Sequence, residues 1–207
     1  WRGPAAWPLR LRQEEMTAAL APLPAPDALA PAIPVLEGAR VRLRAPAARD
    51  LPAYAAFCAS PRTAPLGGPF DADAAFARLS ALIGHWALRG FGRWMVADRE
   101  SDAPLGVVGL MQPPSWPGPE LAWTLFEHAE GRGLAHESAR LARDFAGKVA
   151  GISDLVSLIA PENHRSAALA RRLGAVPDGE TTPPGKPTLT VWRHPSPGKV
   201  TDYEAAR

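Results

Sequence analysis

A short glycine-containing segment ahead of a predicted helix is the part of this sequence best suited to bind an anion. It covers residues 130–135 (EGRGLA) and leads into a helical pattern over residues 136–149. Glycines at alternate positions let the backbone bend tightly and bring its N–H groups close to a ligand. The first N–H groups of a helix have no partner within the helix and lie at the positive end of its dipole. The segment therefore predicts a phosphate site, although glycine-rich loops also occur as plain turns.

Composition limits the chemistry that the rest of the chain can perform. The 207 residues are 46% hydrophobic and 21% charged, with a formal net charge of +2 and scattered basic residues. These values are typical of one globular domain and argue against a nucleic-acid partner. Cys58 is the single cysteine, which excludes an internal disulfide and a multi-cysteine zinc site. We expect Cys58 to be buried on an apolar helix face, and the histidines show no spacing typical of metal ligands.

The two ends of the sequence differ from its middle. Residues 1–34 are rich in proline and alanine and predict an irregular extension, of which residues 1–15 are interpreted as a tag or an over-long gene start. Residues 35–195 are expected to form the domain and residues 196–207 a tail. No apolar run approaches the ~20 residues needed to cross a bilayer, and the start lacks the apolar core of a signal peptide. We therefore expect no membrane partner and a cytoplasmic location.

Periodic patterns predict the elements that must hold the anion site in place. Strands are expected at residues 40–44, 93–97, 105–111, 120–126, 155–160 and 188–194, and helices at 51–58, 72–86, 136–149 and 165–173. Asp50 is expected to cap the first helix, and Asp71 or Asp73 the second, whose apolar face includes Phe76. Residues 177–187 predict an irregular loop. This order indicates an α/β mixture with an antiparallel middle.

Four segments in this order resemble the GNAT acyltransferase superfamily, closest to the branch of the ribosomal-protein N-terminal acetyltransferases. They are residues 40–51 (RVRLR followed by Asp-Leu), 105–110 (LGVVGL), 120–135 (ELAWTL followed by GRGLA) and 163–174 (NHRS followed by Leu-Gly). The resemblance covers about residues 36–194. The family's pyrophosphate loop has Gln or Arg, two residues, Gly, one residue, and then Gly or Ala. Gly133 and Ala135 match it, but Glu130 stands where Gln or Arg is usual, which predicts a modest loss of acetyl-CoA affinity.

The resemblance implies an α/β (α+β) GNAT fold with acetyl-CoA as the co-substrate. Its mixed, mostly antiparallel twisted sheet splays between the fourth and fifth strands and is flanked by helices. The open strand edge would pair with the amides of pantetheine at Leu125 and Phe126. Asn163 would bind pantetheine or a water molecule, or would cap the helix that follows. The pyrophosphate would lie on the backbone N–H groups of Gly131, Arg132, Gly133, Leu134, Ala135 and His136.

The implied reaction is acetyl transfer to a primary amine by direct attack in a ternary complex. The amine must be neutral, and near pH 7.4 roughly a fifth to a third of an α-amine is neutral but only ~0.1% of a free lysine. Glu120 is the candidate base, acting through water; its alternative interpretation is an exposed carboxylate at a strand end. Ser166 is the candidate proton donor to the departing thiolate, or a support for the start of its helix. A protein N-terminus and a small amine are both open as acceptors, and a homodimer is compatible with the sequence.

Two other functions can be weighed on the same residues. A dinucleotide-binding oxidoreductase would need a third glycine where His136 stands and an acidic residue at the end of the next strand, whereas Asp154 precedes that strand. A GNAT-fold sensor or scaffold that binds acyl-CoA without turnover stays open, because Glu130 departs from the family pattern. Release of thiol from acetyl-CoA in the presence of amines would separate that protein from an enzyme.

Overall fold

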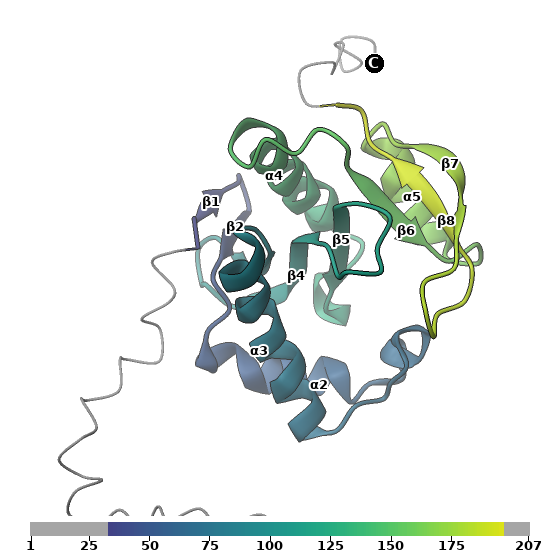
Figure 1. Ribbon diagram of the computed structural model, residues 1–207. Helices are drawn as coiled ribbons and strands as arrows, with labels where there is room; N and C mark the ends of the chain where they lie inside the picture. Colours follow the sequence, from purple (N-terminus) through teal and green to yellow (C-terminus); the bar gives the residue numbers. More distant parts are fainter. Residues whose placement is uncertain (1–32, 197–207) are drawn as a thin grey trace, which may run out of the picture.

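One open sheet with helices on both faces forms the framework of the protein (Figure 1). The computed structural model describes residues 33–196, so the predictions for residues 1–32 and 197–207 lie outside the described part. Within this part the strands are β1 (Leu36–Glu37), β2 (Val41–Arg44), β3 (Arg93–Asp98), β4 (Pro104–Met111), β5 (Glu120–Leu125), β6 (Val156–Ile159), β7 (Val176–Thr181) and β8 (Leu189–Arg193).

The strands lie side by side in the order β1-β2-β3-β4-β5-β6-β8-β7. Neighbouring strands of this sheet are antiparallel, except β5 and β6, which are parallel. A parallel pair requires a crossover connection, which the helix between β5 and β6 provides. The mixed, mostly antiparallel sheet predicted from the sequence is therefore confirmed.

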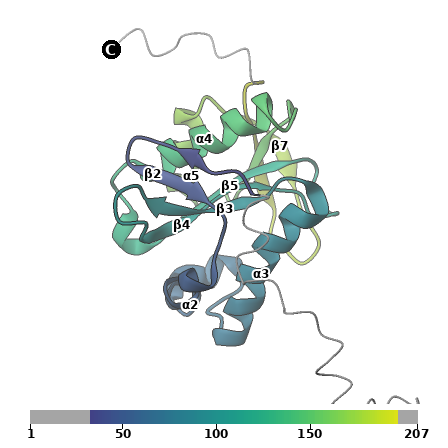
Figure 2. The ribbon, with the colours of Figure 1, turned by 90° about the vertical axis from the view of Figure 1, so that its left-hand side faces the viewer.

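Helices cover both faces of this sheet. They are α2 (Leu51–Cys58), α3 (Ala72–Arg89), α4 (Leu134–Lys148) and α5 (His164–Arg172), with the short 3-10 helices η2 (Ala48–Asp50), η3 (Pro61–Leu66) and η4 (Glu127–Ala129). Figure 2 shows α4 and α5 on one face and α2 and α3 on the other. In the described residues no helix combines the length and apolar character needed to span a membrane.

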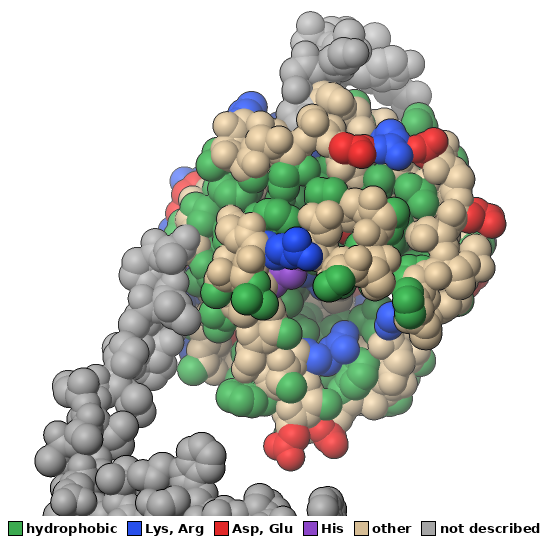
Figure 3. Space-filling model, in the orientation of Figure 1, with side chains coloured by type: hydrophobic (Ala, Val, Ile, Leu, Met, Phe, Trp, Pro, Cys, Tyr) green, Lys and Arg blue, Asp and Glu red, His purple; other side chains and the backbone are tan. Residues whose placement is uncertain are grey.

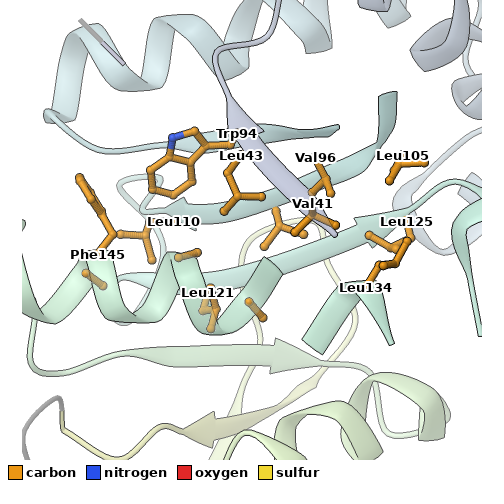
Figure 4. Packing of buried hydrophobic residues seen from close by; sticks show 14 of the residues in the cluster. Val41, Leu43, Trp94, Val96, Leu105, Leu110, Leu121, Leu125, Leu134 and Phe145 are labelled. Atoms are coloured by element: carbon orange, nitrogen blue, oxygen red, sulfur yellow. The ribbon is translucent and has the colours of Figure 1, made fainter. Parts of the chain in front are cut away.

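The larger core lies between α4 and the sheet (Figure 4). Alternation along β3 directs Trp94 and Val96 to this side, where both side chains are fully buried. Trp94 meets Phe145 of α4 edge to face, with 5.1 Å between the ring centroids. Its indole Nε1 donates to the carbonyl of Pro34 at 2.7 Å. Ile33 is also buried, so these two residues, predicted to belong to the irregular extension, pack as part of the domain.

Two smaller apolar clusters complete the packing. On the other face of the sheet, Met95 packs with Val107, with Tyr54 and Cys58 of α2, and with α3. Cys58 is fully buried, as predicted, and burial raises the pKa of its thiol. The other cluster belongs to residues 156–194 (β6, α5, β7 and β8), which we call the C-terminal unit. Its members are Ile159, Ala167, Ala170, Ala175 and Trp192.

A buried ion pair joins β2 to the start of α2. Both guanidinium amino groups of Arg44 donate to the Asp50 carboxylate at 2.8 Å, and the Asp50 side chain is fully buried. Asp50 also accepts from the backbone N–H of Ala47 at 2.8 Å. The prediction that the Asp50 side chain caps α2 is therefore wrong, because that carboxylate is committed to Arg44 and Ala47. Asp71 does cap α3, accepting from Ala74 N at 2.8 Å.

The main difference from the predicted elements is an additional hairpin strand. β7 falls largely within the stretch predicted to be irregular, because Pro177 and Gly179 interrupt any strand pattern and its residues are mostly exposed. The ladder with β8 accommodates them through a register shift between Pro177 and Glu180. The two-residue strand β1 was also not predicted. Phe76, assigned to the apolar face of α3, is instead 60% exposed.

The Arg44–Asp50 pair yields a prediction for stability. Asp50→Ala should lower the free energy of unfolding by about 3 kcal/mol, because it leaves a buried guanidinium with only its half-exposed partner Asp102. Urea unfolding followed by circular dichroism measures this loss. Asp144→Ala is the matched control, because its pair with Lys148 is exposed and should contribute less than about 1 kcal/mol. Equal losses in the two variants would contradict the prediction.

Candidate active site

The sheet opens between β5 and β6, where the parallel pairing is confined to one end of the strands. Glu120 and Val156 form the single registered pair, next to a hydrogen bond from Val156 N to Pro119 O at 3.0 Å. On its other side β5 pairs with β4 along its whole length. Backbone pairing between β5 and β6 therefore ends after the first residue of β5. This is the splay predicted between the fourth and fifth strands of the family pattern.

Two side chains replace backbone partners at the point where the strands part. Glu120 Oε1 accepts from the backbone N–H of Leu158 at 3.4 Å. Ser157 Oγ donates to the carbonyl of Leu121 at 2.6 Å. In a continuous ladder these backbone groups would bond to the opposite strand. Glu120 and Ser157, which we call the wedge, thus satisfy polar groups that the splay would otherwise leave unpaired.

His194 supports the wedge from the end of β8. Its Nε2 lies 2.9 Å from Ser157 Oγ. Because Ser157 gives its hydrogen to Leu121, the imidazole carries its own on Nε2 and donates to Ser157. Burial lowers the pKa of His194 to about 4, and the nearby positive charge of Arg143 acts in the same direction. His194 is therefore a neutral structural group around pH 7.

A cleft of about 430 Å³ lies along the open edge of β5. Its walls come from residues 123–125 of β5, residues 129–136 at the head of α4, residues 163–172 of α5, and η3 with the end of α2. This volume is within the range of small-molecule sites, ~300–1,000 Å³. Figure 3 shows a hollow on the face between α3 and the β7–β8 hairpin, with basic side chains beside it.

The loop at the head of α4 has the backbone geometry that the sequence predicted. Gly131 and Gly133 have φ of 72° and 76°, left-handed values that residues with a side chain rarely adopt. Gly133 is the residue that caps α4. Arg40 holds the loop in place, donating to the carbonyl of Arg132 at 2.8 Å and to Glu137 of α4 at 2.9 Å. Burial disfavours the charge of Glu137, but its bonds to Arg40 outweigh this and lower the pKa of the carboxyl.

The structure brings most of the predicted site residues to one cleft. Those that line it are Leu125, Gly131, Gly133, Leu134, Ala135, His136, Asn163 and Ser166. Glu120, Phe126 and Arg132 do not line it. The expectation for Phe126 needs correction, because its N–H already donates to Leu105 O at 2.8 Å and its ring is buried. Among the described residues no group of three or more His, Cys, Asp and Glu side chains could hold a metal ion.

Asn163 and Ser166 are both engaged at the start of α5. Asn163 Oδ1 accepts from the backbone N–H of Ser166 at 3.0 Å, so the helix-cap interpretation is confirmed. Asn163 also lines the cleft, and its amide nitrogen is a hydrogen-bond donor. Ser166 Oγ accepts from Trp123 Nε1 at 3.3 Å. This bond connects α5 to β5 across the cleft and leaves the Ser166 hydroxyl hydrogen as a donor.

Glu120 is not the exposed carboxylate at a strand end that the sequence offered as the alternative to a base. Its side chain is buried and accepts from Trp116 Nε1 as well as from Leu158 N. Burial raises the pKa of the carboxyl, while the Trp116 hydrogen bond and the charge of Arg93 oppose this rise. The residue is therefore part of the wedge, at the closed end of the splay.

The structure also adds charged residues that the sequence patterns did not indicate. Arg62 of η3 and Arg165 of α5 both line the cleft and both donate to the carboxylate of Glu130. No motif could have found Arg62, because it lies 68 residues from Glu130 in a segment without a recognisable pattern. Arg165 belongs to a quoted motif, but nothing in that motif indicated its partner.

Comparisons with known proteins agree with this geometry. A family model described as an acetyltransferase (GNAT) domain matches residues 40–176. The chain is similar to an acetyltransferase of Agrobacterium tumefaciens str. C58, with 37% identity over 78% of this chain and 94% of the other, and a TM-score of 0.72.

Two more distant structures share the fold. One is a ribosomal-protein-S5-alanine acetyltransferase of Vibrio fischeri, with 18% identity, coverage of 79% and 97%, and a TM-score of 0.63. The other is the ribosomal L7/L12 α-N-protein acetyltransferase RimL in complex with coenzyme A, with 16% identity, coverage of 79% and 99%, and a TM-score of 0.65. At these identities the likeness concerns the fold, which is the GNAT fold expected from the sequence motifs.

His194 gives the splay a pH-dependent component of stability. Its folded pKa of about 4 lies below the unfolded value of about 6.5, so the unfolded chain binds more protons between these values. The free energy of unfolding therefore holds the full contribution of the neutral His194 above pH ~6.5. It falls by about 3 kcal/mol in total as the pH is lowered to ~4. Urea unfolding of the wild type and of His194→Gln at several pH values isolates it. Parallel stability curves for the two proteins would show that His194 does not titrate in this way.

Proposed function

The chain belongs to the GNAT acetyltransferase family, and from this premise we propose that it transfers the acetyl group of acetyl-CoA to a primary amine. The observation that carries the proposal is the meeting of an open strand edge and a helix N-terminus in one cleft. An open edge suits the amides of pantetheine, as an added strand would. The head of α4 suits the pyrophosphate.

The kinds of residue around the cleft support acetyl-CoA as its ligand. Leu125 would bind the pantetheine arm, and Asn163 would contribute its amide nitrogen. The backbone of residues 131–136 would hold the pyrophosphate, with Gly133 keeping the approach free of side-chain atoms. When bound, acetyl-CoA supplies an acetyl group on a thioester, which is activated toward attack by an amine.

The proposed chemistry is direct transfer without an acyl-enzyme. The amine nitrogen forms a bond to the acetyl carbon, the carbon–sulfur bond breaks, and the amine loses a proton while the thiolate gains one. Ser166 is the proposed proton donor to sulfur, since its hydroxyl lines the cleft and accepts from Trp123. The buried Cys58, the last residue of α2, packs on the opposite side of the sheet from α4 and is given no part in this proposal.

Glu120 is proposed as the base that accepts the amine proton, through water. Its raised pKa brings the carboxyl closer to the range of an effective base. Glu120 lies at the apex of the splay and does not line the cleft, so in this proposal a water molecule carries the proton from the amine to its carboxylate. The hollow between α3 and the β7–β8 hairpin supports access for an acceptor on that face. A protein N-terminus and a small amine are both retained as acceptors, and a cytoplasmic location and a homodimer stay predictions.

A second candidate function is acyl-CoA binding without turnover. The observation that favours it is the commitment of Glu120 to Trp116 and Leu158, which gives that carboxylate a structural role. Thiol release from acetyl-CoA, measured with a panel of amines and N-terminal peptides, distinguishes the two. Release that depends on an amine, with acetylated product seen by mass spectrometry, supports the transferase. Binding of acetyl-CoA by calorimetry with no product for any acceptor supports the sensor.

Gly133→Val tests the loop. The variant should raise the Kd for acetyl-CoA roughly tenfold or more, because valine disfavours the left-handed backbone and obstructs the helix N-terminus. A side chain here would also approach Arg40 Nη2, which lies 3.5 Å from the position of the new Cβ. Gly151→Val is the matched control, since Gly151 has a similar φ of 67° but does not line the cleft. Unchanged affinity in Gly133→Val would remove the loop from the proposed site.

Glu120→Gln tests the base. The uncharged amide should lower kcat by roughly 10²-fold or more while leaving the Kd for acetyl-CoA nearly unchanged. Thermal unfolding of the same variant reports any damage to the wedge. A folded variant with full kcat would restrict Glu120 to its structural role.

A further inference from the structure

Three charged side chains from separate elements meet beside the loop that leads into α4. Glu130 Oε1 accepts from Arg62 of η3, and Glu130 Oε2 accepts from Arg165 of α5 at 2.8 Å. The carboxylate is 22% exposed, whereas the Arg62 and Arg165 side chains are 32% and 72% exposed. All three residues line the cleft. We call this group the arginine bridge.

The negative charge of Glu130 would by itself disfavour a phosphate at this loop. A lone carboxylate in the loop proposed to hold a pyrophosphate would repel that group. The two arginines reverse this effect, because the three side chains together carry a net positive charge. Glu130 is the single acidic residue among the described residues lining the cleft, whereas Arg62, Arg165 and Arg172 are basic. The cleft as a whole is therefore suited to an anion.

We propose that Arg62 and Arg165 bind the phosphate groups of acetyl-CoA, and that Glu130 is the residue that positions them. The inference rests on the proposed function and adds two ligand-binding side chains to it. A guanidinium has five N–H donors, and each arginine uses one amino group for Glu130, so further donors are available for a phosphate. Arginine matches phosphate oxygens in a bidentate geometry.

Glu130 contributes by limiting the freedom of two long side chains. An unrestrained arginine loses rotamer entropy when it binds a ligand, and restraint before binding reduces that loss. One carboxylate holds two arginines that come from two different elements of the cleft lining, η3 and α5. The cation or amide that the family carries in the loop itself is thus replaced by two cations held from outside it.

The test compares acetyl-CoA with acetyl-pantetheine, which has the same thioester and amides but no phosphate. Arg62→Ala and Arg165→Ala should each raise the Kd for acetyl-CoA roughly tenfold in calorimetry. With acetyl-pantetheine, kcat/KM should stay within about twofold of the wild type. Arg171→Ala is the matched control: it removes a charge from the same helix, but its guanidinium stacks on Trp192 and does not line the cleft.

Acetyl-dephospho-CoA shows which phosphate is bound. If the variants also raise the Kd for this probe, the arginines bind the pyrophosphate. If the Kd for this probe is unchanged, they bind the 3′-phosphate. Both results support the inference. Unchanged acetyl-CoA affinity in both variants, or an equal penalty with acetyl-pantetheine, overturns it. If the wild type binds no acetyl-CoA, the proposed function itself fails. If the wild type binds acetyl-CoA and both variants bind it with the same Kd, only the role of the arginines fails.

A double-mutant cycle tests the positioning role of Glu130. In the Glu130→Ala background, Arg165→Ala should raise the Kd for acetyl-CoA by less than about threefold, because an unrestrained arginine has less binding to lose. This comparison does not depend on the effect of Glu130→Ala alone. A tenfold penalty that is the same in both backgrounds would leave the arginines as ligands but would overturn the role of Glu130.

Discussion

The separation of β5 from β6 is the constraint on which the rest of the site depends. Two parallel strands that start in register would normally continue to pair, since unpaired backbone groups are costly inside a protein. Here the carboxylate of Glu120 and the hydroxyl of Ser157 occupy those backbone groups at the apex, and His194 holds Ser157 in turn. Because the apex is satisfied in this way, the strands can diverge, and the edge of β5 beyond it becomes one wall of a cleft.

The remaining walls are fixed by ion pairs that join distant parts of the chain. Arg40, which immediately precedes β2, ties the turn before α4 to the first turn of that helix. Arg44 joins β2 to the segment that begins α2, and through it to η3 on the far wall. The arginine bridge then spans the mouth. These contacts add charged links between the cleft walls to the apolar packing of the two larger clusters.

The sequence predicted the framework better than the detail of the site. The elements with regular apolar periods, such as β3, β4 and α4, were found because alternation and helical spacing follow directly from burial. The glycine loop was found because Gly131 and Gly133 occupy positions that need left-handed backbone. β7 was missed because an exposed strand with a proline and a glycine has no apolar period. The contacts of Glu120 with Leu158, of Glu130 with its two arginines and of Asp50 with Arg44 could not be inferred, since only the folded chain brings these partners near.

The C-terminal unit is attached to the sheet by an unusually small seam. It has its own apolar cluster, yet β6 shares one registered pair with β5, whereas β8 pairs with β6 over four residues. Backbone pairing therefore contributes less at this seam than in any antiparallel ladder of the sheet. Side chains therefore supply much of the attachment of α5 to the rest of the molecule: Arg143 of α4 donates to the carbonyl of Leu173, and Trp123 of β5 donates to Ser166.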